Sequence, residues 1–338
     1  MALDQSPNTN YVVYTAPTNT SWQQILNAMI NDGVTVISNS WSDCEDQHTL
    51  ADVQSIDAVL AAAAASGVSI FNGSGDTGAT CLDGSANTVG VPASSPHATA
   101  VGGTTPIASD GATYGGAMWW DGSAKLPPTG QGGFGVSRYF ARPSYQDGLA
   151  ASTMRSVPDL AVIADPRFGL GLCRADAGGC PDGLMHGGTS MAAPGMAVMT
   201  ANLNERLGAN IGEVNPVIYP LAATNAFHSA ASMGTDFAHV GLGSPSLNYL
   251  RLLLSHQTIG PVSPSLSLVA SSRIAVDDGV TAGLIQVNLV DANGYPVSGK
   301  SVTLTPNGTS HAVITSVSGP SDLNSGAVVF HLTDTTIE

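Results

Sequence analysis

The chain has 338 residues, of which 43% are hydrophobic, so it is long and apolar enough to build one large domain and a small one. It carries 25 acidic and 10 basic residues, a net charge of -15, which excludes nucleic acid as a partner because no basic stripe can neutralise phosphates. No apolar stretch of membrane-spanning length is free of polar breaks, so no transmembrane segment is expected.

The N-terminal part alternates between two kinds of pattern. Three short apolar runs rich in β-branched residues, 11–15, 34–39 and 68–72, predict buried parallel strands. The segments between them, 21–31 and 49–65, have helical apolar spacing. Strands and helices in alternation predict an α/β fold with a parallel sheet flanked by helices.

Small and polar residues follow the second and third predicted strands. Ser40, Trp41 and Ser42 come after one strand, and Gly75 and Asp76 come after the next. Ligands of such sheets bind beyond the carboxyl ends of the strands, so both segments are expected to lie at a site.

The middle of the chain, 104–181, is rich in glycine and aromatic residues and has little periodicity, which predicts long loops and short strands. Long loops in a compact domain usually shape a site. A helix is expected to begin at Ser190 and to continue through the apolar run 191–199. A short helix follows 214–216, and the segment 246–254 closes the first domain.

The amino-acid composition changes at 255–264, where it becomes that of a linker. Apolar and polar residues then alternate in 283–290 and 301–305, with a turn at 291–296, which is the pattern of strands in a β-sandwich. The predicted domains are therefore a first domain at 1–254, the linker at 255–264 and a small all-β domain at 265–338.

The C-terminal part resembles the bacterial immunoglobulin-like repeats of invasin-type surface proteins. The resemblance rests on the strings Val-Asp-Ala-Asn-Gly-Tyr-Pro-Val at 290–297 and Ser-Gly-Ala-Val-Val-Phe at 325–330. It implies a spacer or adhesive module with a sandwich fold. The chain ends where a last strand should be finishing, so the repeat is expected to be incomplete.

The four cysteines form no CxxC pair and no zinc-like spacing with histidine. Cys173 and Cys180 enclose a short hairpin-like segment, and Cys44 and Cys81 each follow an apolar strand pattern, so two disulfides are predicted; free buried thiols are the alternative. Disulfides indicate an oxidising compartment and hence an extracellular protein. The start at Met1 is neither basic nor followed by an apolar run, so any export signal is expected to lie outside this chain.

Residues 187–194 read Gly-Gly-Thr-Ser-Met-Ala-Ala-Pro and place Ser190 at the start of a small-residue helix. A hydroxyl there can act as a nucleophile, because small residues allow close approach and the backbone N–H groups of a helix start favour developing negative charge. A plain helix-capping sequence is the alternative interpretation.

From 2 to 254 the chain resembles the sedolisins, the serine-carboxyl peptidases, which have a subtilisin-like fold. The matching segments, in order, are 36–41, 73–79, 91–104, 132–138, 157–166 and 187–194. Subtilisins use the same Gly-Thr-Ser string but need a His-Gly-Thr-His string and an oxyanion-hole asparagine. This chain has no such histidine string, His97 lies in a structural segment, and sedolisins place an aspartate where Asp76 stands, although an aspartate after Ser-Gly is also a common turn residue.

The resemblance implies a mechanism that needs no cofactor. Ser190 attacks the carbonyl of a protein or peptide substrate, and protonated Asp76 holds the oxyanion with the backbone N–H of Ser190. An ionised aspartate cannot donate a hydrogen bond, so the enzyme is expected to work in acid. Substrate would lie as an added strand between Ser40-Trp41-Ser42 and Gly132-Gly133, with Ser42 replacing the usual glycine of the family.

Two features of the family do not match. Its general base is a glutamate with an aspartate four residues later, ahead of a strand that begins here near Tyr11, yet Glu45 is the only glutamate before Ser190. The chain is therefore expected to be truncated and nearly inactive alone. The two calcium-binding aspartates of the family correspond to Ser229 and Phe237, although Asp236 is adjacent, so a calcium site is doubtful.

Two functions remain open. The first is a secreted acid endopeptidase, or a fragment of one, with an appended β module. The second is a catalytically silent surface or adhesion protein that uses a peptidase-like scaffold. Retention of Ser190 and Asp76 favours the enzyme, and absence of the base favours the binding protein.

Overall fold

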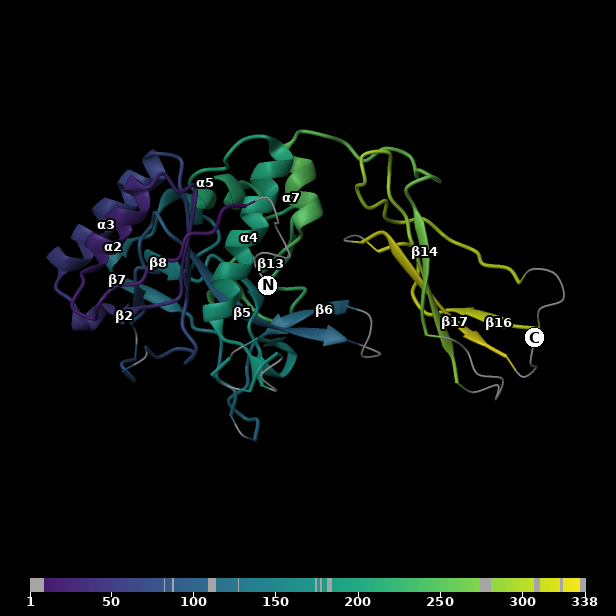
Figure 1. Ribbon diagram of the computed structural model, residues 1–338, viewed down its shortest axis with the longest axis horizontal. Coiled ribbons are helices and arrows are strands. Elements are labelled where there is room, and N and C mark those ends of the chain that lie inside the picture. The colour runs from purple at the N-terminus through teal and green to yellow at the C-terminus, as the bar shows by residue number, and fades with distance from the viewer. Residues whose placement is uncertain are drawn as a thin grey trace. The chain divides into compact units, whose positions relative to one another are not determined.

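Figure 1 shows the fold of the chain as a computed structural model. It describes residues 9–81, 83–86, 88–108, 114–126, 128–173, 175–176, 178–180, 184–273, 281–306, 311–322 and 325–334. The chain forms two compact units that divide between Pro245 and Ser246. Of the helices in these ranges, none combines the length and the hydropathy that a membrane span requires.

A five-stranded, mostly parallel sheet forms the centre of the first unit. Its strands are β1 (Val36–Asn39), β3 (Ser69–Gly73), β5 (Thr99–Ala108), β6 (Tyr114–Trp119) and β9 (Leu160–Ile163). The order is β1-β3-β5-β6, and β9 also pairs with β5. All pairings are parallel except β5 with β6, which is antiparallel. The α/β class and the strands expected in 34–39 and 68–72 are confirmed.

The strand predicted at 11–15 is wrong. The described segment from residue 9 to residue 20 contains no strand, and Val12 and Val13 are 59% and 85% exposed. Among the described residues, β1 pairs with β3 and with no strand on its other side. Strand propensity reports packing on a pleated surface, so an apolar β-branched run without a neighbouring strand does not become one.

Three helices of the first unit carry the core and the site: α2 (Trp22–Asn31), α3 (Leu50–Ala65) and α4 (Thr189–Leu207). α2 and α3 lie side by side (Figure 1), and each begins with a capping box, from Ser21 and from Thr49. α4 packs against β1, β3 and β5 through small residues such as Ala192 and Ala193, which are fully buried. The three predicted helices are confirmed.

The remaining elements of the first unit are short, as the glycine-rich composition predicts. They are β2 (Asp43–Cys44), η1 (Glu45–Gln47), β4 (Gly90–Val91), β7 (Gly135–Ala141), η2 (Ser144–Gln146), β8 (Met154–Val157), η3 (Pro166–Phe168), β10 (Leu170–Gly171), β11 (Met185–His186), α5 (Val214–Ile218), η4 (Tyr219–Leu221), β12 (Phe227–His228), α6 (Phe237–Val240) and β13 (Ser244–Pro245).

The second unit contains one helix and a separate four-stranded antiparallel sheet. The helix is α7 (Leu247–Leu254), and the strands are β14 (Leu268–Arg273), β15 (Gly283–Asn288), β16 (Val313–Ser316) and β17 (Ala327–Thr333). Their order is β14-β15-β17-β16. The strand predicted at 301–305 is wrong, because the described residues 301–306 form no strand. The immunoglobulin-like sandwich stays a prediction.

α7 packs on the turn that follows β15. Tyr249 and Leu252 contact the buried Tyr295, and the Arg251 guanidinium lies 4.1 Å from the centre of the Tyr295 ring. The predicted linker is tied to the same turn, since the Gly260 N–H donates a hydrogen bond to Asp291 Oδ2 (2.8 Å). We therefore describe α7 with the second unit, although the sequence predicts it to close the first domain.

Candidate active site

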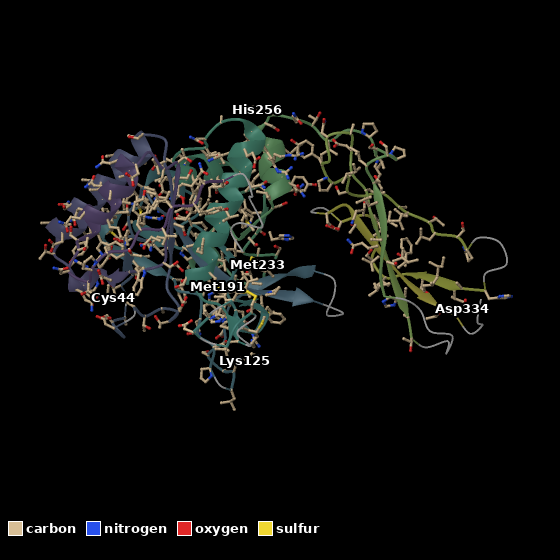
Figure 2. All side chains as sticks on the ribbon, viewed as in Figure 1. Cys44, Lys125, Met191, Met233, His256 and Asp334 are labelled. Carbon is tan, nitrogen blue, oxygen red and sulfur yellow. A yellow bond between two sulfur atoms is a disulfide. The ribbon has the colours of Figure 1, made fainter. Side chains whose placement is uncertain are left out.

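Ser190 lies in the first turn of α4, is exposed, and directly precedes Met191, which is labelled in Figure 2. The helix is preceded by Gly188, whose φ of 95° is a conformation that other residues rarely adopt. A Cβ at Gly188 would lie 2.6 Å from Asp76 Oδ2. The glycine is therefore required for both the backbone turn and the close approach of the carboxyl group.

Asp76 follows β3 and reaches across to the start of α4. Its Oδ1 accepts hydrogen bonds from the Thr189 N–H (2.7 Å) and from Thr189 Oγ1 (2.8 Å). Thr189 Oγ1 in turn accepts the N–H of Gly75 (3.1 Å), and Thr189 is only 2% exposed. The structure thus brings Asp76 next to Ser190 and assigns Thr189 the task of holding it.

The segment after β1 is also attached to the helix start. Ser40 Oγ donates to the backbone oxygen of Ser190 (2.8 Å). Asn39 Nδ2 donates to the Trp41 carbonyl (2.8 Å) and to Asn72 Oδ1 on the neighbouring strand. Trp41, the residue after Ser40, is 79% exposed.

Asn39, Asn72 and Thr189 are supporting residues that the sequence analysis did not identify. Asn39 and Asn72 are register partners on β1 and β3, so their side chains meet at the same sheet edge. Polar residues at the last positions of two predicted parallel strands are the signal that could have found them.

Gly132 and Gly133 pack closely on the same strand ends. The Gly133 N–H donates to the Gly75 carbonyl (2.7 Å), and the Gly132 N–H donates to Trp120 (2.9 Å). A Cβ at Gly133 would lie 2.8 Å from the Gly75 backbone. These glycines thus have a packing role, and both N–H groups are already bonded within the protein. Their contact with substrate stays a prediction.

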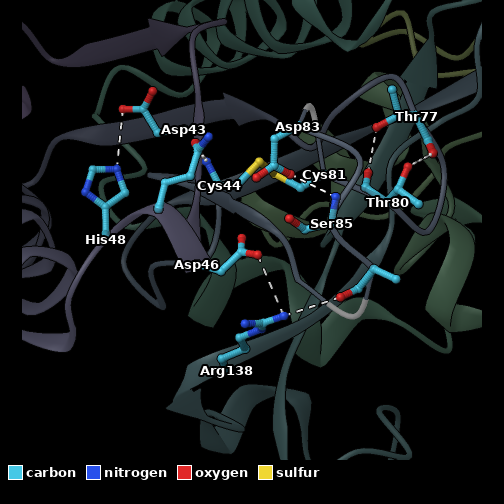
Figure 3. The surroundings of a disulfide bond; sticks show 12 residues. Asp43, Cys44, Asp46, His48, Thr77, Thr80, Cys81, Asp83, Ser85 and Arg138 are labelled. Carbon is cyan, nitrogen blue, oxygen red and sulfur yellow. Dashed lines mark hydrogen bonds and ion pairs between the residues drawn. A yellow bond between two sulfur atoms is a disulfide. The ribbon is translucent and has the colours of Figure 1, made fainter.

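Both predicted disulfides are present. Cys44 of β2 is bonded to Cys81 in the loop after β3, with 5.8 Å between the Cα atoms (Figure 3). Cys173 is bonded to Cys180. The first bridge joins the segment after Ser42 to the segment after Asp76, so it links the two loops that follow β1 and β3.

Glu45, the glutamate nearest the site in sequence, is fully buried and already bonded. Its carboxylate accepts from Ser137 Oγ (2.5 Å) and from the Arg138 N–H (2.7 Å). It therefore fixes the start of β7 and cannot serve Ser190 as a base. His97 is likewise paired elsewhere, with Nδ1 3.0 Å from Glu213 Oε1.

The residues at the calcium position that the resemblance implies fit the ion poorly. Asp236 caps α6 by accepting the His239 N–H, and the same Oδ1 lies 2.6 Å from His239 Nδ1. The side chain of Ser229 accepts the Ser232 N–H within a local turn. One carboxylate that already has partners falls short of the six to eight oxygens of a typical site, so no chemistry is assigned to calcium here.

Comparisons with known proteins agree with this geometry. No family model matches the chain. Kumamolisin of Bacillus sp. (strain MN-32) is 32% identical over 281 residues, which are 74% of this chain and 48% of kumamolisin. Sedolisin of Pseudomonas sp. (strain 101) is 32% identical over 234 residues, 65% of this chain and 37% of sedolisin. The chain thus spans about half, or less, of the length of these curated relatives.

A solved structure supports the same relationship. Pseudomonas sedolisin, a serine-carboxyl proteinase complexed with two molecules of pseudo-iodotyrostatin, aligns with a TM-score of 0.59 and 25% identity over 69% of each chain. The sequence similarity and the shared fold together show that this chain belongs to the sedolisin and kumamolisin family of serine-carboxyl peptidases, which has a subtilisin-like fold.

Proposed function

We propose that the chain carries the nucleophile and the oxyanion-binding carboxyl group of a secreted endopeptidase that cleaves protein or peptide substrates in acid. The observation that carries the proposal is the double hydrogen bond from Thr189 to Asp76 Oδ1. It holds the carboxyl group beside Ser190 and leaves Oδ2 directed toward Gly188 at the helix start. The two disulfides fit export to an oxidising compartment.

In this mechanism Ser190 Oγ attacks the substrate carbonyl and forms a tetrahedral oxyanion. The N–H of Ser190 lies in the first turn of α4, where helices have no internal acceptor for it, so it is free to donate to the oxyanion. Protonated Asp76 donates the second hydrogen bond. Collapse of the oxyanion expels the amine and leaves an acyl-enzyme, which water hydrolyses through the same arrangement.

The proton of Ser190 requires a base that the described residues do not supply beside it. Glu45 and His97 are both bonded elsewhere. We therefore propose that a further segment, with the Glu-x-x-x-Asp helix of the family, completes the site. Without it the chain should be slower by several orders of magnitude.

The test compares the chain alone with the chain joined to a segment that carries a Glu-x-x-x-Asp helix. Cleavage of an unfolded protein is followed from about pH 3 to about pH 7, a range that spans the titration of carboxyl groups. The joined protein should cleave in acid, and Ser190→Ala should remove about 10³-fold or more of its kcat/KM.

Asp76→Asn is the sharper variant in this assay. An amide donates a hydrogen bond at any pH, so this variant should retain cleavage as pH rises toward neutrality, whereas Asp76→Ala should lose about 10²-fold or more throughout. If Asp76→Asn and the unmodified protein declined together with rising pH, Asp76 would have no role at the oxyanion.

The same experiment distinguishes the enzyme from the second candidate function, a catalytically silent surface or adhesion protein. The absence of a base beside Ser190 among the described residues is the observation that favours this second candidate. A joined protein that stays inactive at every pH, with no difference between Ser190 and Ser190→Ala, would support the binding protein instead.

A further inference from the structure

The main chain of Asp76 is held by a segment other than the start of α4. The N–H of Gln131, in the segment that precedes β7, donates to the Asp76 carbonyl (3.0 Å). Gln131 also forms a parallel bridge with Thr77, and the Phe134 N–H donates to the Gly78 carbonyl (3.0 Å). The position of the Asp76 main chain therefore depends on where Gln131 is held.

The side chain of Gln131 is fixed as well as its main chain. Its Nε2 donates to Asp121 Oδ1 (2.9 Å). A Cβ built on Gly78 would lie 2.7 Å from Gln131 Oε1, so the amide group lies directly over that glycine. Gly78 has a φ of 65°, a conformation that other residues rarely adopt. Asp121 thus reaches the Asp76 segment through one side chain, that of Gln131.

Asp121 is in turn fixed by the loop that follows β6. Its Oδ1 accepts the N–H (3.2 Å) and the Oγ hydroxyl (2.7 Å) of Ser123. The Gly122 N–H donates to the Gly130 carbonyl (2.9 Å), which closes the base of this loop next to Gln131. One carboxylate oxygen therefore accepts hydrogen bonds from both ends of the loop and ties them together.

Asp121 keeps its charge further into acid than an ordinary aspartate does. Hydrogen bonds from Ser123 and Gln131 outweigh desolvation and, with the positive charge of Lys125, hold the pKa of Asp121 below its ordinary value. Lys125, which is labelled in Figure 2, lies on the same loop. The bond to Gln131 is thus kept to a lower pH, in the direction in which the proposed mechanism needs Asp76 protonated.

The placement of the main chain matters because Asp76 has to act over one hydrogen bond. A donor to an oxyanion must lie about 2.7–3.1 Å from it, and a displacement of about 1 Å can cost about 10²-fold in rate. Thr189 bonds to one carboxyl oxygen of Asp76, whereas Gln131 bonds to the main-chain carbonyl of the same residue. With both ends held, the side chain of Asp76 has little freedom to move.

We propose that Gln131, held by Asp121, is a positioning residue for Asp76 and sets the place of its carboxyl group at the oxyanion. The proposal rests on the proposed peptidase function, because it assigns a role within that mechanism. Neither Gln131 nor Asp121 touches the reacting atoms in this role. Both act only through the main chain of Asp76.

The first measurement uses the chain alone and requires no activity. NMR follows hydrogen exchange at the Gln131 amide, which is bonded to Asp76. Asp121→Ala should lower the protection of this amide about tenfold, because Gln131 loses its anchor. Asp121→Asn should preserve the protection, because an amide oxygen accepts the same hydrogen bond. Asp83→Ala is the matched control, since Asp83 is also exposed and accepts the N–H of a serine two residues on, Ser85 (2.9 Å), within its own turn.

The second measurement uses the protein joined to the Glu-x-x-x-Asp segment. Asp121→Ala should lower kcat about tenfold and leave KM nearly unchanged, as expected when only the transition state loses a contact. Asp121→Asn and Asp83→Ala should both retain kcat. If Asp121→Ala does not fold, Gln131→Leu replaces it, because leucine keeps the bulk over Gly78 and cannot donate to Asp121.

Unchanged exchange of the Gln131 amide in Asp121→Ala would overturn the proposal. A raised KM with constant kcat, an equal fall of kcat in Asp83→Ala, or a loss that Asp121→Asn does not restore would overturn it as well. If the unmodified joined protein cleaves nothing, the peptidase function is refuted and the positioning role falls with it. Cleavage that is equal in the unmodified protein and in Asp121→Ala refutes the positioning role alone.

Discussion

At the scale of single residues, the site depends on carboxyl groups whose neighbours are fixed by the fold. Asp76 is held by Thr189, and Glu45 by Ser137 and the Arg138 backbone. Asp165 lies in the chain segment that the helix start contacts, because the Gly188 N–H donates to the Ala164 carbonyl (2.6 Å). If the proposed activity in acid is correct, such groups must stay bonded as the pH falls.

Asp165 allows a prediction about how the stability of the fold changes as the pH falls. Burial raises the pKa of Asp165, but hydrogen bonds from Arg167 and Thr105 outweigh burial and hold the pKa below its ordinary value. A carboxyl group with a lowered pKa stabilises the fold above its unfolded pKa of about 3.9, and this stability is lost as the pH falls through the folded pKa.

Asp165→Asn should therefore destabilise the protein most above about pH 5, and the difference from the unmodified protein should shrink below about pH 4. Urea unfolding at a series of pH values measures it. A difference that stayed constant or grew in acid would show that the charge of Asp165 is not what stabilises this segment.

At the scale of elements, the central sheet is joined to its surroundings by a buried ion pair. Arg155, within β8, and Asp159, just before β9, are both fully buried and form two hydrogen bonds, of 2.8 and 2.6 Å. Asp159 also accepts the Ala100 N–H of β5 (2.8 Å), and Arg155 donates to the Ser95 carbonyl (3.1 Å). Burial lowers the pKa of Arg155, but the adjacent carboxylate of Asp159 outweighs it and raises the pKa.

Arg155→Met should lower the free energy of unfolding by about 3–5 kcal/mol, because it leaves Asp159 buried without a counter-charge. The exposed Arg206 of α4 provides the control, since Arg206→Met should change stability by less than about 1 kcal/mol. Chemical denaturation of both variants measures the difference. A similar small change in the two variants would mean that the pair contributes no more than surface charges do.

The elements also show where sequence patterns are reliable. The helices α2 and α3 follow from their capping boxes and apolar spacing, which act within a few residues. The run at 11–15 has an equally good strand pattern and forms none, because a strand needs a neighbour that its own residues cannot specify. For the same reason the pattern at 301–305 does not become a strand.

At the scale of the whole molecule, the chain contains two compact units with separate cores. The second is built around Val287, Val328 and Phe330 of its sheet, and a satellite cluster joins α7 to Tyr295. Tyr295 is 2% exposed, and its hydroxyl lies 3.2 Å from Ser255 Oγ. The turn after β15 is thus expected to be essential for the second unit.

Tyr295→Ala should destabilise the second unit by about 3–5 kcal/mol through the cavity it leaves. Tyr295→Phe keeps the ring packing and removes only the hydroxyl contact, so it should change stability by about 1 kcal/mol. Two-dimensional NMR during urea unfolding follows the units separately. An equal effect of the two variants would argue against packing on α7 as the source of stability.

Some properties of this protein were determined by the sequence itself, because the forces behind them are local or because few arrangements satisfy them. The helix start at Ser190 needs Gly188 and small neighbours, and four cysteines in this order allowed both disulfides to be paired correctly. The six ordered segments that resemble the sedolisins were sufficient to indicate the serine-carboxyl peptidase family.

The tertiary structure alone decided which distant groups meet. Thr189 holds Asp76 across a separation of 113 positions, and the Glu45 carboxylate is bonded to Ser137 of β7. Hydrogen bonding and burial at such distances depend on how the strands are ordered in the sheet, and no local pattern encodes that order.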